Sequence, residues 1–214
     1  YAIPTKGGKL KPVRTSEGHR HISSFISNDG KKVYYTSTKE DQTYLKSYLY
    51  DLENDTEEVI LEGEGAPTFL IEKSPKEESL VYKKLFANTS QLAYAVKDGE
   101  HIRLTPETEE QHTIGGLTYA SETDLYFTTT YHADFSYLAK FNLEKKEFSK
   151  VTGLDQVSFT DVKYDQSLNS LYIVGEKGVK DSLYRYDLEN GTLEELDIPV
   201  SVILQLKVAE SGNV

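Results

Sequence analysis

The sequence contains no cysteine, no tryptophan and no methionine. Without cysteine there is no disulfide, no thiol nucleophile and no cysteine-ligated zinc, and a cysteine-free chain fits a reducing and an oxidising compartment equally well. Without tryptophan, repeats built on a Trp-Asp dipeptide are excluded. The absence of any methionine, the initiator included, suggests a segment cut from a longer chain, or methionines missing from the sequence as written.

Long apolar runs and basic residues are also scarce. No run approaches the roughly 18 apolar residues of a spanning helix, and no basic-then-apolar leader is present, so we expect neither a membrane span nor a targeting segment. Lys and Arg number 24 against 35 Asp and Glu, and the resulting net charge of -11 argues against binding a nucleic acid backbone. The 214 residues, with a mean hydropathy of -0.53, indicate a soluble globular chain.

The chain does contain a repeat. Turn dipeptides flanked by β-forming residues recur at intervals of 44 to 47 residues, by subtraction of their numbers: Gly7-Gly8, Asn54-Asp55, Asp98-Gly99, Lys145-Lys146 and Asn190-Gly191. Asp-Gly and Asn-Gly are typical of tight type I′ hairpins. Alternating aliphatic and aromatic residues precede the last four turns, as in Leu183-Tyr184-Arg185-Tyr186. Two strands of one hairpin are therefore expected around each turn.

A second series of turns lies in register with the first. Its members are Asn28-Asp29-Gly30, Pro75-Lys76, Ser121-Glu122, Gln166-Ser167 and Ser211-Gly212. Compact apolar triplets such as Val33-Tyr34-Tyr35 follow the first four. Together the two series predict four strands per repeat of about 45 residues, which is the period and content of a β-propeller blade. The fold class is therefore all-β; a sandwich or barrel is the alternative, and the regular spacing weighs against it.

The repeat also sets predicted boundaries. We expect a single β-propeller domain over residues 1–214, with strands named a to d from the axis to the rim of each blade. Four complete blades are predicted at 21–65, 66–110, 111–156 and 157–199. Residues 1–17 read as strands c and d of a partial blade, and residues 203–214 begin a further blade, with strand a at 203–211. The chain is either a five-bladed ring or a fragment of a larger propeller, and the missing strand b of a fifth blade favours the fragment.

Two segments resemble a known family. Ser27-Asn28-Asp29-Gly30-Lys31-Lys32-Val33-Tyr34-Tyr35 resembles the Ser-Pro-Asp-Gly-Lys-x-Ile-x-Phe motif of TolB-like propellers and of the amino-terminal propellers of the prolyl oligopeptidase family, with Asn28 in place of proline. Gly7-Gly8 followed by Val13-Arg14-Thr15 resembles the Gly-Gly…Arg-Leu-Thr link between their strands c and d. The resemblance implies a propeller fold. For the peptidases it implies a gating and substrate-sorting role beside a separate α/β-hydrolase domain.

No catalytic constellation emerges from the sequence. A nucleophile elbow requires Gly-x-Ser-x-Gly, which occurs nowhere, and among 35 acidic residues no pair can be singled out for acid–base work. The acidic turns at Asp51 and Asp187 depart from the spacing of a calcium loop. Gly115-Gly116 predicts a bulge or a close backbone approach, because no helix start follows that could cradle a phosphate. We therefore predict no catalytic residue, no metal and no cofactor.

Two of the five histidines are candidates for ligand binding. His21 and His112 occupy the same place in repeats one and three, just before strand a, where the loops of a propeller converge on the channel mouth. Two blades apart, they are not expected to share a metal ion. The alternative is that both are packed, hydrogen-bonded loop residues. The charge-rich stretch from Glu57 to Glu64 is expected to be solvated rim.

Two hypotheses of function follow. The first is a non-catalytic, TolB-like propeller that acts as an interaction or ligand-binding module, with protein or peptide rather than nucleic acid as its partner. The alternative is a fragment of the substrate-gating propeller of a prolyl-oligopeptidase-type serine peptidase whose catalytic domain is absent from this chain. A hydrolase or lyase with carboxylates in the channel has no residue to support it. Localisation leans outside the cytoplasm on the resemblance alone, and the oligomeric state stays open.

Overall fold

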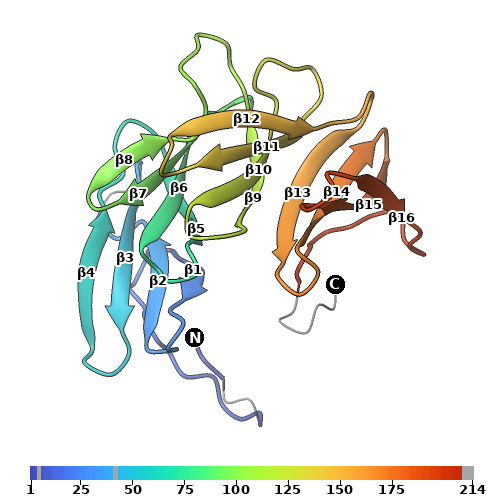
Figure 1. The fold of residues 1–214 in the computed structure, drawn as a ribbon. Coiled ribbons are helices and arrows are strands. Elements are labelled where there is room, and N and C mark those ends of the chain that lie inside the picture. Colours follow the sequence, from blue (N-terminus) through green and yellow to red (C-terminus); the bar gives the residue numbers. More distant parts are fainter. Residues whose placement is uncertain (4–5, 41–42, 209–214) are drawn as a thin grey trace. The chain divides into compact units, whose positions relative to one another are not determined.

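The computed structural model describes residues 1–3, 6–40 and 43–208. In these ranges the regular secondary structure consists of β-strands, numbered β1 to β16, and contains no helix (Figure 1). Consequently the described residues include no helix long and apolar enough to cross a membrane. The chain forms two compact units, Tyr1–Ile71 and Glu72–Val214.

The strands form four sheets of four, and each sheet is a meander in which consecutive strands pair. The first contains β1 (His21–Ile26), β2 (Lys32–Ser37), β3 (Lys46–Asp51) and β4 (Thr56–Leu61). The second contains β5 (Thr68–Lys73), β6 (Ser79–Ala87), β7 (Ser90–Lys97) and β8 (Glu100–Arg103). The third contains β9 (Ile114–Tyr119), β10 (Asp124–Thr129), β11 (Tyr137–Asn142) and β12 (Glu147–Thr152). The fourth contains β13 (Ser158–Asp165), β14 (Ser170–Lys177), β15 (Lys180–Asp187) and β16 (Leu193–Leu196).

The predicted all-β fold with four four-stranded blades is confirmed, and each sheet lies within one of the predicted repeats. A single domain over residues 1–214 stays a prediction. The predicted terminal strands differ from the structure. In residues 1–17 the described positions contain only an isolated bridge, in which Ala2 and Lys11 exchange two backbone hydrogen bonds of 2.8 Å. A two-stranded hairpin without a third strand is marginal, which explains why the pairing extends no further.

The strand a predicted at 203–211 is not seen in residues 203–208, the part of this range that the structure describes. Residues 203–208 have no strand conformation, while residues 209–214, including the Ser211-Gly212 turn, lie outside the described residues. Instead, Leu206 packs with Tyr172, Val174 and Leu183 of the fourth sheet in a small apolar cluster. Side-chain burial and the hydrogen bond from the Ile203 N–H to Asp181 Oδ2 at 2.7 Å, rather than strand pairing, therefore hold this segment in place.

Turn conformations confirm four of the five turns in the first series of repeat signals, those that follow Gly7-Gly8. Asp98 and Gly99, between β7 and β8, have φ angles of 52° and 79°, both positive as a type I′ turn requires. Asp55, Lys146 and Gly191 supply the positive φ at the corresponding turns of the other three sheets. A non-glycine residue in this region costs roughly 1–2 kcal/mol, so the surrounding strands must impose it.

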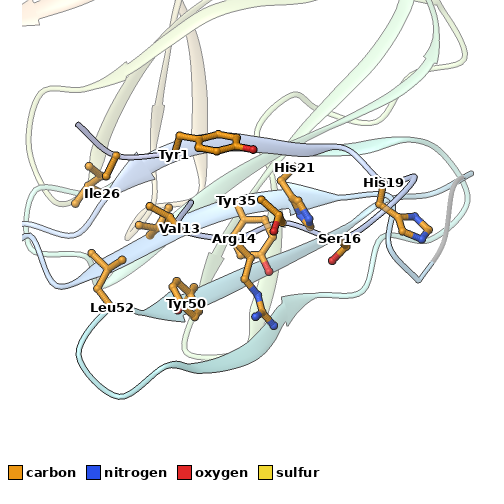
Figure 2. A pocket seen from close by; sticks show the side chains of 13 residues that line it. Tyr1, Val13, Arg14, Ser16, His19, His21, Ile26, Tyr35, Tyr50 and Leu52 are labelled. Carbon is orange, nitrogen blue, oxygen red and sulfur yellow. The ribbon is translucent and has the colours of Figure 1, made fainter. Parts of the chain in front are cut away.

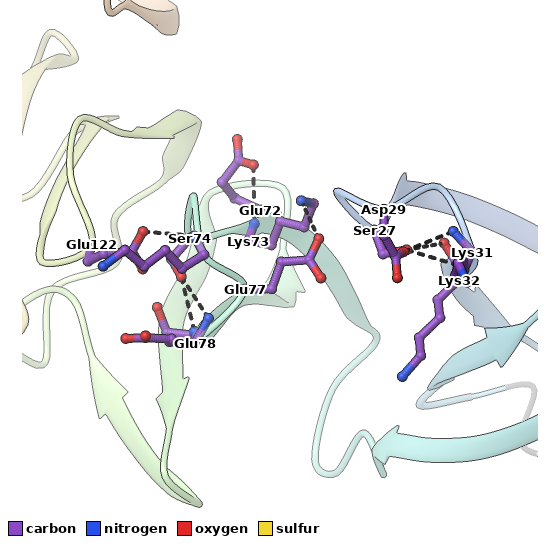
Figure 3. Close-up of polar contacts among 12 residues, drawn as sticks. Ser27, Asp29, Lys31, Lys32, Glu72, Lys73, Ser74, Glu77, Glu78 and Glu122 are labelled. Atoms are coloured by element: carbon purple, nitrogen blue, oxygen red, sulfur yellow. Dashed lines mark hydrogen bonds and ion pairs between the residues drawn. The ribbon is translucent and has the colours of Figure 1, made fainter.

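The turn between β1 and β2 shows why its motif begins with serine (Figure 3). The Ser27 hydroxyl donates to Asp29 Oδ1 at 2.6 Å and accepts the Lys32 N–H at 2.9 Å. Asp29 Oδ1 also accepts the Lys31 N–H at 2.9 Å, and Gly30 takes the left-handed conformation with φ 72°. The serine and aspartate side chains thus satisfy backbone donors that the turn would leave unpaired.

The second repeat builds an equivalent turn from a different sequence. The Ser74 hydroxyl accepts the N–H groups of Glu78 and Ser79 at 3.0 and 3.2 Å, as Figure 3 shows for Ser74 and Glu78. Glu77, with φ 62°, stands where Gly30 stands in the first repeat. The motif is therefore repeated in structure although the Asp-Gly pair is not repeated in sequence.

In the second unit, the core lies between the third and fourth sheets. Strands β10 and β14 are almost entirely buried, which fits central strands covered on both faces. Tyr126 and Leu138 of the third sheet pack in one cluster with Val157, which directly precedes the fourth sheet, and with residues of the fourth sheet itself. These are Phe159, Val162, Leu171, Ile173 and Tyr184. This face-to-face contact is the packing expected of neighbouring propeller blades.

Strands β9 and β13 approach closely at Gly115 and Gly116. A Cβ atom on Gly116 would lie 2.0 Å from Asp161 Oδ1, so no larger side chain fits. The pairing of β10 with β9 shifts register between Phe127 and Thr129, opposite these glycines. Both expected features, a bulge and a close backbone approach, are therefore confirmed.

Candidate functional site

A cleft of about 530 Å³ opens in the first unit beside His21 (Figure 2). Its walls come from β1, β2, β3 and the segment that precedes β1. Three tyrosines, five aliphatic residues, two histidines, two hydroxyl residues and one arginine line it: Tyr1, Ala2, Val13, Arg14, Thr15, Ser16, His19, His21, Ile26, Val33, Tyr35, Tyr50 and Leu52. Its size lies in the range of roughly 300–1,000 Å³ that small-ligand sites occupy.

An ion cluster centred on Glu57 of β4 supports this cleft. Arg14 Nε donates to Glu57 Oε2 at 2.9 Å, the Tyr35 hydroxyl donates to the same oxygen, and the Lys39 ammonium group pairs with Oε1. The Glu57 side chain is only 15% exposed. Burial by itself raises a carboxyl pKa, but the donors Arg14, Lys39 and Tyr35 outweigh it and lower the pKa of Glu57 to about 2. Glu57 therefore stays ionised down to strongly acidic pH.

Tyrosine rings position the two cations of the cluster. Tyr35 and Tyr48 stack with centroids 5.2 Å apart, and Lys39 Nζ lies 4.0 Å from the centre of the Tyr48 ring. Arg14 Cζ lies 5.3 Å from the centre of the Tyr50 ring, which adds a second cation–π contact. Burial raises the pKa of Tyr48 to about 12, and burial together with the hydrogen bond to Glu57 raises the pKa of Tyr35. Both phenols thus stay protonated at neutral pH.

His21 stands edge-on to Tyr35, with ring centroids 5.4 Å apart and an interplanar angle of 74°. Its two ring nitrogens are buried, and neither has a hydrogen-bond partner among the residues described. Burial, followed by the positive charges of Lys39 and Arg14, lowers the pKa of His21. The neutral ring therefore holds one N–H donor and one acceptor unused, each at a cost of roughly 1–3 kcal/mol. A buried unpaired group of this kind calls for a functional explanation.

His112 has the opposite environment in the second unit. It is 3% exposed and meets Tyr131 edge-on, with ring centroids 5.3 Å apart. Nδ1 lies 3.3 Å from the Glu110 carbonyl oxygen and Nε2 lies 3.0 Å from the Thr105 hydroxyl. Because a carbonyl only accepts, Nδ1 carries the proton and Nε2 accepts from Thr105. With both ring nitrogens hydrogen-bonded within the chain, His112 has the packed environment of the alternative, and ligand binding by His21 and His112 stays a prediction.

The acidic turns use their carboxylates locally. Asp51 Oδ1 accepts the N–H groups of Glu53 and Asn54 at 2.8 and 2.9 Å, and the Asn54 side chain donates to Oδ2 at 3.0 Å. These hydrogen bonds lower the pKa of Asp51, and the bond from the Asn54 backbone N–H has the largest effect. The turn at Asp187 repeats the same three bonds. Over the described ranges, no group of three or more metal-ligating side chains comes together.

Sequence reasoning missed the Glu57 cluster. Glu57 was expected on a solvated rim, whereas the structure partly buries it between two cations. Its partners Arg14 and Lys39 lie 43 and 18 residues away in the chain. No local pattern reports such a contact, so only the assembled sheet reveals it.

No sequence family and no curated protein sequence matches this chain. Solved structures do match. TolB from Acinetobacter baumannii has a TM-score of 0.65 at 17% identity, over 91% of this chain and 47% of that one. A putative TolB from Agrobacterium tumefaciens has a TM-score of 0.62 at 16% identity, over 79% and 62%. Prolyl oligopeptidase B from Galerina marginata has a TM-score of 0.66 at 12% identity, over 89% and 28%.

This chain thus spans less than two thirds of each of these proteins. At such identities the likeness concerns the fold. The fold is that of the TolB-like propellers, which the propeller of the prolyl oligopeptidases shares, and the resemblance drawn from Ser27 to Tyr35 is confirmed at that level.

Proposed function

We propose that this propeller module has no catalytic activity of its own and binds a peptide segment of a partner protein in the cleft beside His21. The observation that carries the proposal is the cleft itself. The aromatic and aliphatic walls are held by the partly buried ion cluster of Glu57, and they enclose a histidine with two unpaired ring nitrogens. A concave, largely apolar site with a few oriented polar groups is the usual form of a binding pocket.

The titration of the surrounding groups supports binding over acid–base chemistry. A general acid or base works best with a pKa near the operating pH. The pKa of Glu57 is lowered to about 2 and that of Tyr35 is raised, so both groups move away from neutrality. They keep fixed protonation states and act as a rigid frame for the cleft.

Peptide arrays test this proposal. An array of random octapeptides would be probed with the full chain, and the tightest peptides would be titrated calorimetrically. Ile26, 56% exposed on the wall of the cleft, is changed to Asp to place a charge on the apolar surface. Val179, 91% exposed in the second unit, is changed to Asp as the matched control. We expect at least a tenfold loss of affinity in I26D and none in V179D; equal affinities in the two variants would refute the cleft as the site.

A second candidate is the substrate-gating propeller of a serine peptidase of the prolyl oligopeptidase type. It is favoured by the likeness to prolyl oligopeptidase B, of which this chain spans 28%. The gene on both sides of this segment tests it: a Gly-x-Ser-x-Gly-bearing domain is expected, and a stop codon soon after Val214 would contradict it. A place outside the cytoplasm stays a prediction, which cell fractionation would test.

A further inference from the structure

We propose that the cleft recognises the C-terminal residue of a peptide with an apolar side chain, and that the Arg14 guanidinium group binds its carboxylate. This inference rests on the proposed binding function and names the chemical class of the ligand. The structure supports it through the unused donors of Arg14, the local charge and the exposed apolar wall.

Arg14 has hydrogen-bond donors to spare. Its Nε–H donates to Glu57 at 2.9 Å, and Tyr35 is the other side-chain partner of the guanidinium group. Among the described residues, the two Nη groups have no hydrogen-bond partner beyond these two. The side chain is 39% exposed and lines the cleft (Figure 2). A guanidinium group presents its N–H bonds in a planar fork that matches the two oxygens of a carboxylate.

The guanidinium group is also held in place before any ligand arrives. Glu57 fixes one edge of it, and the Tyr50 ring lies 5.3 Å from its central carbon. An arginine on a free surface loses side-chain entropy when it binds a ligand. Here much of that loss has already occurred on folding, which favours affinity.

Arg14 is the only Lys, Arg, Asp or Glu among the described residues that line the cleft. The one carboxylate bound to it, Glu57, also pairs with Lys39, so its negative charge is shared between two cations. The whole chain has a net charge of -11. A carboxylate is therefore attracted to Arg14 although most of the surface repels it.

The apolar wall of the cleft favours a carboxylate that is attached to an apolar side chain. Ile26 and Leu52 line the cleft and are 56% and 41% exposed, beside the more buried Val33. A volume of about 530 Å³ accommodates one or two residues and excludes a folded domain. An apolar side chain next to a terminal carboxylate satisfies both the wall and the guanidinium group.

Matched probes test this ligand class. The probes are N-acetyl-Ala-Leu with a free carboxylate, the same dipeptide as its C-terminal amide, and isocaproate, which keeps the carboxylate and the branched alkyl group without the peptide. Calorimetric titration of the full chain is expected to give at least tenfold tighter binding of the acid than of the amide. Equal binding of acid and amide would overturn the role of the carboxylate. Isocaproate binding as tight as that of the dipeptide would overturn the peptide terminus as the ligand.

Variants of Arg14 make the test specific. In Arg14→Gln the preference for acid over amide, measured as the ratio of the two affinities in the same variant, is expected to fall below twofold. Arg14→Lys, which keeps the charge and loses the planar fork, should retain only part of the preference. If Arg14→Gln alone unfolds the chain, the double variant Arg14→Gln with Glu57→Gln removes the whole pair and carries the same expectation. A preference retained without Arg14 would overturn the inference.

The two proposals fail in different ways. If the amide binds as well as the acid and Ile26→Asp abolishes both, the binding function stands and the carboxylate inference is wrong. If neither the probes nor the arrayed peptides bind the folded chain, the binding function itself is wrong.

Discussion

Replacing Glu57 by Gln is the sharpest test of the ion cluster that supports the cleft. Glutamine keeps the size of the side chain and an oxygen that accepts from Tyr35, but it removes the charge that pairs with Arg14 and Lys39. The change therefore isolates the electrostatic contribution of the carboxylate from its packing.

The expected magnitude follows from the pKa of Glu57. A shift from 4.5 to about 2 corresponds to about 3 kcal/mol, at about 1.4 kcal/mol for each pKa unit. The folded chain holds the ionised form more strongly than the unfolded chain does, so this contribution is complete above pH 4.5. It is lost progressively as the pH falls from 4.5 to about 2, because over this range the unfolded chain binds a proton that the folded chain does not. At pH 7 we expect E57Q to be less stable than the wild type by about 3 kcal/mol.

Urea unfolding at pH 7, 4.5, 3 and 2 measures this difference directly. Subtracting E57Q from the wild type cancels the titration of the other carboxyl groups. Glu53→Gln is the matched control, because the Glu53 side chain is 60% exposed and its pair with Lys31 is a surface salt bridge, for which less than about 1 kcal/mol is expected. A difference between wild type and E57Q that stays constant from pH 7 to pH 2 would show that the charge of Glu57 does not stabilise the fold.

Four further substitutions test other parts of the structure by the same unfolding assay. Replacing His21 by Phe removes two unpaired buried nitrogens and should raise stability by about 1 kcal/mol or more. Because the folded pKa of His21 is lowered, the wild type should also lose stability relative to this variant as the pH falls below 6.5. His112→Phe breaks two hydrogen bonds and should lower the free energy of unfolding instead. If both variants changed the stability in the same direction, the distinction between an unpaired His21 and a hydrogen-bonded His112 would be refuted. Gly116→Ala should lower the free energy of unfolding by about 2 kcal/mol or more, because the new Cβ atom would clash with Asp161. Gln156→Gly should raise it by about 1 kcal/mol, because the exposed Gln156 has a φ of 62°, which glycine adopts without strain. A stable G116A or a weakened Q156G would contradict these geometries.

The turns were predictable because their chemistry is local. Asp98-Gly99 favours a type I′ turn wherever two strands flank it. Gly115-Gly116 predicted a close backbone approach, because only glycine leaves room for a neighbouring strand at these positions. Terminal strands could not be judged in this way. Val13 and Arg14 carry the expected pattern, yet a strand also requires a partner along its length, and the described residues supply only the bridge from Ala2 to Lys11. Pairing is a property of the assembled sheet, which the pattern of one segment does not contain.

The two histidines show how far a repeat can predict a site. The sequence predicted one position of the repeat for His21 and His112, but the backbone contacts differ. Arg20 and Thr113 each exchange hydrogen bonds with a threonine at the end of the next strand, so His21 corresponds to Ile114 and His112 to His19. Their side-chain partners come from residues that the repeat does not fix. Thr105 and Glu110 satisfy the ring of His112, whereas the ring nitrogens of His21 have no hydrogen-bond partner among the described residues. A binding site in such a fold is therefore to be sought where a buried polar side chain lacks a partner within the chain, as His21 does beside Arg14.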